Sequence, residues 1–185
     1  MRSEVPHAVS RARPQNSCER SYNGHYMKAG QAAEARVLGW LAVHSGVIGV
    51  EDLRGLRQMR EADVDCSVQL VDGRMVLAEI KSDWHLGVSG NVLFETLRIN
   101  HTAPPDRAVT LGWSARTPAR WILYYAPQKD CIYQISTDDL RSGLQAYTSE
   151  LRSRSRLSYV ETDRIKSTVN VLIPERFVAH RVHEL

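Results

Sequence analysis

The amino-acid sequence predicts an α/β domain with a mixed central β-sheet flanked by helices. Two observations support this fold class. Two β-rich runs surround a strong turn signal at Asp72-Gly73, and runs with helical apolar spacing lie before and after them. A length of 185 residues suits one such domain with a short extension. We therefore predict a single domain over residues 27–185, preceded by a flexible leader over residues 1–26 that lacks any periodicity.

Composition and charge exclude several classes of protein. The formal net charge is only +3, so the chain is not a polycation that coats nucleic acid by charge alone. Cys18, Cys66 and Cys131 lack C-x-x-C spacing, which argues against a structural zinc site or a disulfide scaffold and favours a reducing compartment. No apolar run approaches the length of about 18 residues that a membrane helix needs, and the N-terminus lacks an apolar signal core. We expect a cytoplasmic protein without a membrane span.

A helix is predicted over residues 28–44, ending near Gly46. One face of this helix carries residues at the i, i+3, i+4, i+7 spacing, namely Glu34, Val37, Leu38 and Leu41. The carboxylate of Glu34 thus falls in the apolar stripe, where a charge is unfavourable unless it is paired or binds a cation. Two interpretations remain: Glu34 lies at the edge of the stripe and pairs with a neighbour, or it contributes to a functional site.

The central feature of the sequence is a β-hairpin made of residues 64–71 and 74–81. A strict two-residue turn at Asp72-Gly73 would mix apolar and charged side chains on each face. A three-residue loop or a bulge instead gives one wholly apolar face, formed by Val64, Cys66, Val68, Leu70, Val76, Ala78 and Ile80. We predict this second register, which gathers Asp65, Glu79 and Lys81 on the other face.

The charged face has a plain interpretation and a chemical one. Two carboxylates and a lysine commonly form a solvated surface with an incidental ion pair. Adjacent carboxylates also bind a hard cation such as Mg²⁺, which lowers the pKa of bound water, while a nearby ammonium orients or deprotonates that water. Asp63 is a rival for Asp65 on the same face, but Asp65 lies within the β-rich run and pairs better with Glu79.

The segments next to the hairpin carry further candidates. Three arginines, Arg54, Arg57 and Arg60, are spaced by three before the hairpin; they form either a solvated face or contacts to phosphate. After it we expect a loop over residues 82–91 and a strand over residues 92–97 that carries Glu95.

The sequence of the C-terminal half predicts further helices and strands that would pack around the hairpin. A short helix or turn over residues 114–120 precedes a second hairpin, whose strands cover residues 121–127 and 131–136. Ser136 or Thr137 should cap a helix. Its buried stripe consists of Leu140, Leu144, Tyr147 and Leu151. A last strand is predicted over residues 169–173.

The order of an acidic helix residue, then Asp65, then Glu79-Ile80-Lys81 resembles the PD-(D/E)XK nuclease superfamily. The following runs "GN-VLFE" and "GWSARTPARWILYY" look like a small phage and mobile-element branch of it, so the match spans roughly residues 28–148. The proline that names the superfamily is absent before Asp65. The resemblance implies a restriction-endonuclease-like core in which Asp65 and Glu79 ligate a metal ion, the Ile80 carbonyl adds a ligand and Lys81 assists the nucleophile.

The resemblance also implies roles outside the hairpin. Glu34 fits the helix glutamate that these proteins often contribute to the site. Glu95 resembles the acid of a Gly-Asn-x-x-x-Glu element, with a residue at a strand edge as the alternative, and Asn91 would contact phosphate or orient the loop.

These features together predict a Mg²⁺-dependent endonuclease, in which Mn²⁺ can substitute, acting on nucleic acid, with DNA favoured. A homodimer is compatible with this function. The rivals are a catalytically silent nucleic-acid-binding module with the same fold and an accessory protein of a phage or mobile element.

Overall fold

The computed structural model describes the backbone of residues 17–84, 86–150, 157–161 and 166–185. Side chains are described within residues 28–84, 86–149 and 167–185. Residues 1–16 of the predicted leader and Leu151 of the predicted helix stripe lie outside these ranges. Within them, the helices are too short or too polar to cross a membrane.

The helical elements are α1 (Ser17–Val43), α2 (Arg57–Glu61), α3 (Leu86–Ser89), α4 (Trp113–Arg116) and α5 (Thr137–Glu150), with 3-10 turns η1 (Pro105–Arg107) and η2 (Glu175–Phe177). The strands are β1 (Val47–Asp52), β2 (Cys66–Leu70), β3 (Met75–Ser82), β4 (Asn91–Asn100), β5 (Val109–Leu111), β6 (Trp121–Ala126), β7 (Cys131–Ser136), β8 (Leu157–Glu161), β9 (Lys166–Pro174) and β10 (His180–Glu184).

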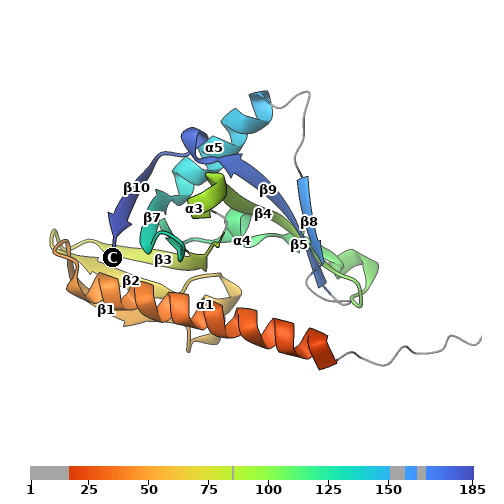
Figure 1. Ribbon diagram of the computed structural model, residues 1–185, viewed down its shortest axis with the longest axis horizontal. Helices are drawn as coiled ribbons and strands as arrows, with labels where there is room; N and C mark the ends of the chain where they lie inside the picture. Colours follow the sequence, from red (N-terminus) through yellow and green to blue (C-terminus); the bar gives the residue numbers. More distant parts are fainter. Residues whose placement is uncertain (1–16, 85, 151–156, 162–165) are drawn as a thin grey trace, which may run out of the picture.

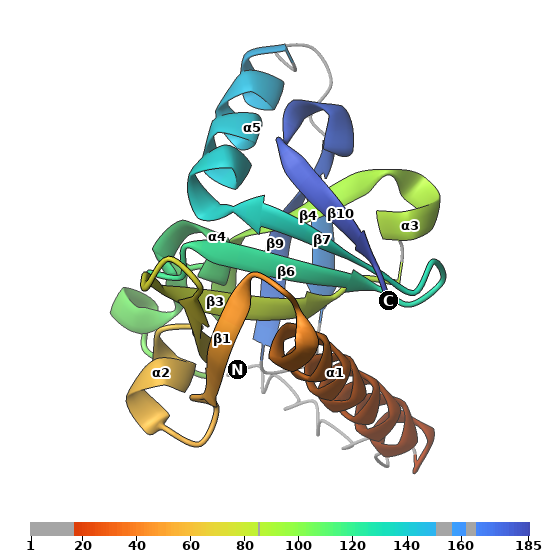
Figure 2. The same cartoon turned by 90° about the vertical axis from the view of Figure 1, so that its left-hand side faces the viewer.

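The strands of the described chain form two sheets (Figure 1). The first has the order β1-β2-β3-β6-β7-β10, in which β3 and β6 run parallel and all other neighbours run antiparallel. Helices α1 and α5 lie on opposite sides of its strands in both views (Figures 1 and 2). This mixed, helix-flanked sheet confirms the predicted fold class. The second sheet, β5-β4-β9-β8, is antiparallel and was not predicted.

The hairpin of β2 and β3 has the predicted three-residue loop. The strand pairing ends in a hydrogen bond of 2.9 Å from the N–H of Leu70 to the carbonyl of Arg74. The loop therefore consists of Val71-Asp72-Gly73. Its last residue has a φ of +83°, a left-handed conformation that glycine adopts without steric cost.

Helix α1 buries its apolar stripe on one face of the first sheet. Val37 and Leu41 are buried there, in a core cluster with the hairpin residues Cys66, Val68, Leu70, Val76, Ala78 and Ile80. The predicted apolar face is thus confirmed except at Val64, which packs in the other core cluster. The left-handed backbone of Asp63, with a φ of +55°, turns the chain just before Val64.

The start of α1 differs from the prediction. The helix begins at Ser17, well before the predicted start at residue 28, so residues 17–26 of the predicted leader are helical. The sequence before residue 28 has no apolar periodicity from which a helix could be predicted. The absence of proline from residues 17–43 is compatible with one continuous helix.

The opposite face of the first sheet is covered by the second sheet and by α5. The shared core cluster joins side chains from these layers, including Phe94, Ile122, Tyr124, Ile135, Leu140, Val171 and Ile173. The charged side of the hairpin therefore lies between two layers of the protein and not on an open surface.

Predictions for the supporting elements hold with shifted boundaries. Helix α5 begins at Thr137, and Ser136 Oγ accepts a hydrogen bond of 2.9 Å from the N–H of Asp139, as an N-cap does. The predicted loop over residues 82–91 contains α3, and the strand predicted over residues 92–97 is the longer β4. Strands β8 and β10 were not predicted.

Candidate functional site

Asp65 lies where the pairing of β2 with β3 stops. Its N–H donates to the carbonyl of Ala78 at 2.9 Å, and its Oδ2 accepts a hydrogen bond of 2.8 Å from the N–H of Ile80. Because β2 begins only at Cys66, the Asp65 carboxylate replaces a backbone acceptor at this point of β3. The carboxylate is thereby fixed next to Glu79.

Glu79 is the most unusual group of the site because it is a buried acid. The residue is 2% exposed, so the plain interpretation of a solvated face does not apply to it. Burial raises the pKa of Glu79 to about 7; the Lys81 charge opposes this, and the charges of Asp65 and Asp63 add to it. Its Oε1 forms an ion pair with Lys81, while its Oε2 is buried without a hydrogen-bond partner among the described residues.

Lys81 connects the buried acid to solvent. Its side chain is 29% exposed, and its Nζ lies 5.0 Å from the centroid of the Trp113 ring, in a cation–π contact. Trp113 belongs to α4 and is itself buried. The ammonium group is thus held between Glu79 and an aromatic face, and one side of it remains open.

Asp63 forms ion pairs with two arginines that the sequence analysis did not identify as candidates. Its Oδ1 pairs with Arg98 at 3.2 Å, and its Oδ2 pairs with Arg116. Arg98 also pairs with Glu95 at 2.6 Å, and Glu95 Oε1 accepts a hydrogen bond of 3.2 Å from the N–H of Trp113. This network joins β4 and α4 to the chain just before the hairpin, and it leaves Asp65 as the acid beside Glu79.

Glu34 has a different partner from the one expected. Its Oε2 pairs with Arg54 at 2.5 Å, and Arg54 also pairs with Asp52 at 2.6 Å. The guanidinium lowers the pKa of Asp52 to about 2. Of the two interpretations of Glu34, the structure agrees with the one in which its carboxylate pairs with a nearby side chain.

We expected Glu34 to lie beside Asp65 and Glu79, and the structure corrects this expectation, because Glu34 is paired with Arg54. The described residues contain no group of three or more histidine, cysteine, aspartate or glutamate side chains that could hold a metal ion. The physical reason is that Arg54, two residues after β1, forms an ion pair with the Glu34 carboxylate. The arrangement offers two neighbouring carboxylates and a lysine.

The remaining candidates lie at the surface. Arg57 is exposed and pairs with Glu61 at 2.8 Å within α2, and Arg60 is exposed on the same helix. Asn91 Nδ2 donates to the carbonyl of Ser89 at 3.2 Å. Helix α2 leads directly into Asp63 and the hairpin, so its arginines lie in the segment that precedes the acids.

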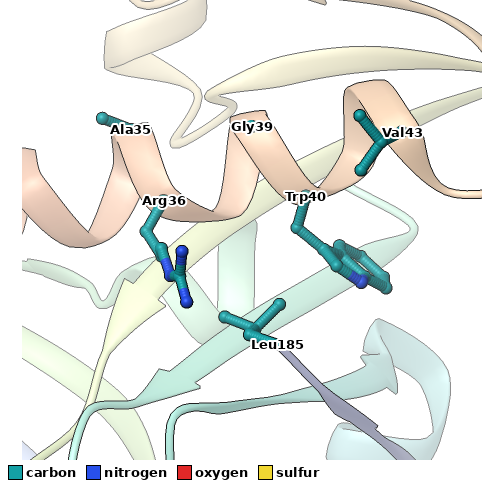
Figure 3. Close-up of a pocket in the computed structure, with 6 residues that line it drawn as sticks. All are labelled: Ala35, Arg36, Gly39, Trp40, Val43 and Leu185. Atoms are coloured by element: carbon teal, nitrogen blue, oxygen red, sulfur yellow. The ribbon is translucent and has the colours of Figure 1, made fainter.

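Two of the cavities among the described residues border helix α1. One of about 350 Å³ lies between α1 and the C-terminal residue Leu185 (Figure 3). Its only charged side chain is Arg36, which pairs with Asp130 at 2.8 Å. A smaller cavity of about 210 Å³ lies between α1 and the end of β3 and is lined in part by Glu34 and Lys81. Of these two spaces, the smaller one adjoins the candidate site.

Comparisons with known proteins give little guidance. No protein family and no curated protein matches the chain. Among solved structures, the chain is similar to a bacterial homing endonuclease, I-Ssp6803I, at 18% sequence identity and a TM-score of 0.42. The similarity covers 60% of this chain and 69% of that one. A likeness at this level carries no argument about function, which rests on the site itself.

Proposed function

We propose that this protein is a metal-dependent nuclease that hydrolyses phosphodiester bonds of DNA. The observation that carries the proposal is the buried Oε2 of Glu79, without a described partner, beside Asp65 and Lys81. A buried carboxylate oxygen without a partner costs free energy. A bound cation would offset that cost, and it would stand where two carboxylates and an ammonium group meet.

The donor set fits Mg²⁺. This ion is commonly held by one or two carboxylates and completes its octahedron with water and substrate phosphate oxygens. Asp65 and Glu79 would supply the two carboxylates, and the Ile80 carbonyl is a third oxygen on the same strand. Such a site needs no third acidic side chain from α1. Mn²⁺ accepts the same oxygen ligands and would substitute.

The side chains divide the chemistry between them. When bound, the cation would lower the pKa of a coordinated water and neutralise charge on the phosphodiester. Lys81, held by Glu79 and the Trp113 ring, would orient the attacking water or stabilise the developing charge. Glu79 can ligate a cation only after it loses its proton, so its raised pKa ties cleavage to pH.

Substrate contacts outside the hairpin would come from α2. Arg57 and Arg60 are exposed and precede the acids in the chain. Guanidinium groups at such positions bind backbone phosphates and fix the orientation of the nucleic acid without reading its sequence. Asn91, at the start of β4, is a further polar contact of this kind.

The test is a cleavage assay with labelled duplex, branched and single-stranded DNA, with and without Mg²⁺ or Mn²⁺. Wild-type protein should cut only with metal, and Asp65→Asn should lose cleavage because the carboxylate beside Glu79 is gone. Glu61→Gln is the matched control, since Glu61 is an exposed acid paired only within α2. Cutting in the presence of a chelator, or equal cutting by Asp65→Asn, contradicts the proposal. Binding without cutting at every metal concentration identifies a silent nucleic-acid-binding module.

A further inference from the structure

The cavity between α1 and the end of β3 has an unusual wall. Its volume is about 210 Å³, and small residues of α1, Ala29 and Gly30, form one side of it. A Cβ atom added at Gly30 would meet nothing within 4 Å, so the space beside the helix is open. Such a space holds about seven water molecules, which suits one planar ring system but not a base pair.

The opposite wall carries an exposed aromatic ring. Trp84 follows β3 and is 46% exposed. The other tryptophans are buried or half-buried, with Trp113 at 3%. A large indole surface left in water is unfavourable, and it is the surface on which a nucleobase stacks.

Polar groups complete the lining. Lys81, whose ammonium belongs to the candidate site, and Ser82 both line the cavity. Ser82 Oγ is buried and has no hydrogen-bond partner among the described residues. This buried hydroxyl has almost no surface that a ligand in the cavity could contact, so it lies behind the lining. The cavity thus combines an aromatic side chain with a cationic residue.

We propose that this cavity, on the α1 side of β3, receives one unpaired nucleobase stacked on Trp84. The nucleic-acid strand would pass the end of β3 at Lys81 and place a phosphodiester at Asp65 and Glu79 on the other side. A base inside a duplex has both faces stacked and its edge paired, so it cannot enter a space of this size. The substrate would therefore carry an unpaired nucleotide at this point, as in a single strand, a flap or a bulge. The position of the cleaved bond rests on the proposed nuclease function, whereas the binding of the base does not.

The test measures binding in a chelator, so that it does not depend on cleavage. A short single-stranded DNA with one 2-aminopurine reports stacking by loss of fluorescence. Trp84→Ala should weaken its binding by about 5- to 150-fold, the range for one base stacked on one aromatic side chain. Trp84→Phe should keep most of the affinity and the quenching. Gly30→Leu should block the cavity from the opposite wall and weaken binding as well.

Controls separate this site from general effects. Val88→Ala removes an exposed apolar side chain on α3 and should bind as wild type does. Binding of a fully paired duplex should be unchanged by Trp84→Ala. Equal single-strand binding by wild type and Trp84→Ala, no binding at all, or an equal loss for duplex and single strand overturns the proposal. Quenched binding by a wild type that cuts nothing with metal would refute the nuclease function and leave the base site standing.

Discussion

Replacing Glu79 with glutamine should change how the stability of the metal-free protein depends on pH. Burial raises the pKa of Glu79 from its ordinary 4.5 to about 7 in the folded state. Between these values the folded protein binds more protons than the unfolded chain, so wild-type stability falls as pH rises through this window. Below about pH 4.5 both states are protonated and this loss is absent.

The size of this change in the free energy of unfolding follows from the difference between the pKa of Glu79 in the folded and unfolded states. Each tenfold change in proton affinity corresponds to about 1.4 kcal/mol, so ionising Glu79 in the folded state costs on the order of 3 kcal/mol. Glu79→Gln keeps the shape of the side chain and does not ionise. Its stability relative to wild type should therefore rise by about 3 kcal/mol between about pH 4.5 and about pH 8 in a chelator.

Urea unfolding at several pH values measures this difference, with Glu61→Gln as an exposed control. Adding Mg²⁺ at about pH 8 should stabilise wild type but not Glu79→Gln, because the ion binds the ionised carboxylate. A difference between wild type and Glu79→Gln that does not change with pH would refute the reasoning, since Glu79 would then ionise equally easily in both states.

Three further changes have calculable outcomes. Lys81→Met should lower the cleavage rate by more than about 10²-fold, with metal affinity in a binding titration nearly unchanged; a full rate would remove Lys81 from the reaction. Asp63→Ala removes the partner of Arg116 and leaves Arg98 with Glu95, and it should cost about 2 kcal/mol in urea unfolding because both guanidinium groups are partly exposed; a neutral result would show that the network is dispensable. Gly73→Ala should cost about 1 kcal/mol, since φ is +83° and a Cβ there has no clash, while Gly55→Ala should cost less.

The sequence predicted the hairpin because its signals are local. The loop around Asp72 and the alternation from Cys66 to Ile80 are set by neighbouring residues, and the requirement for one apolar face selects a single register. The position of Glu79 and Lys81 on the same face of β3 follows from that register, and the structure contains the ion pair between them.

The burial of Glu79 could not be predicted in the same way. It depends on the layer formed by β4, α4 and β9, and β4 pairs with β9 across a long stretch of chain, as in Phe94 with Val171. No local pattern encodes such a contact. The pairing of Glu34 with Arg54 is likewise a meeting of a helix with the end of a strand, which only the folded chain defines.

The arginine partners of Asp63 were missed for a related reason. Arg98 and Arg116 belong to β4 and α4, and in the sequence they look like ordinary charged residues. The one signal that could have found them is chemical, since a buried aspartate requires a cation nearby. That reasoning can be applied only when the structure shows that Asp63 is buried.

The most direct test of the central claim is to locate Mn²⁺ in crystals of the protein by anomalous scattering. We predict one peak at about 2.1 Å from an Asp65 carboxylate oxygen and from Glu79 Oε2, with Lys81 Nζ still paired with Glu79 Oε1. The peak should vanish in Asp65→Asn. A crystal soaked in Mn²⁺ that shows no peak between these two carboxylates, or a peak only at the exposed acids around Asp52, would contradict a metal site at Asp65 and Glu79.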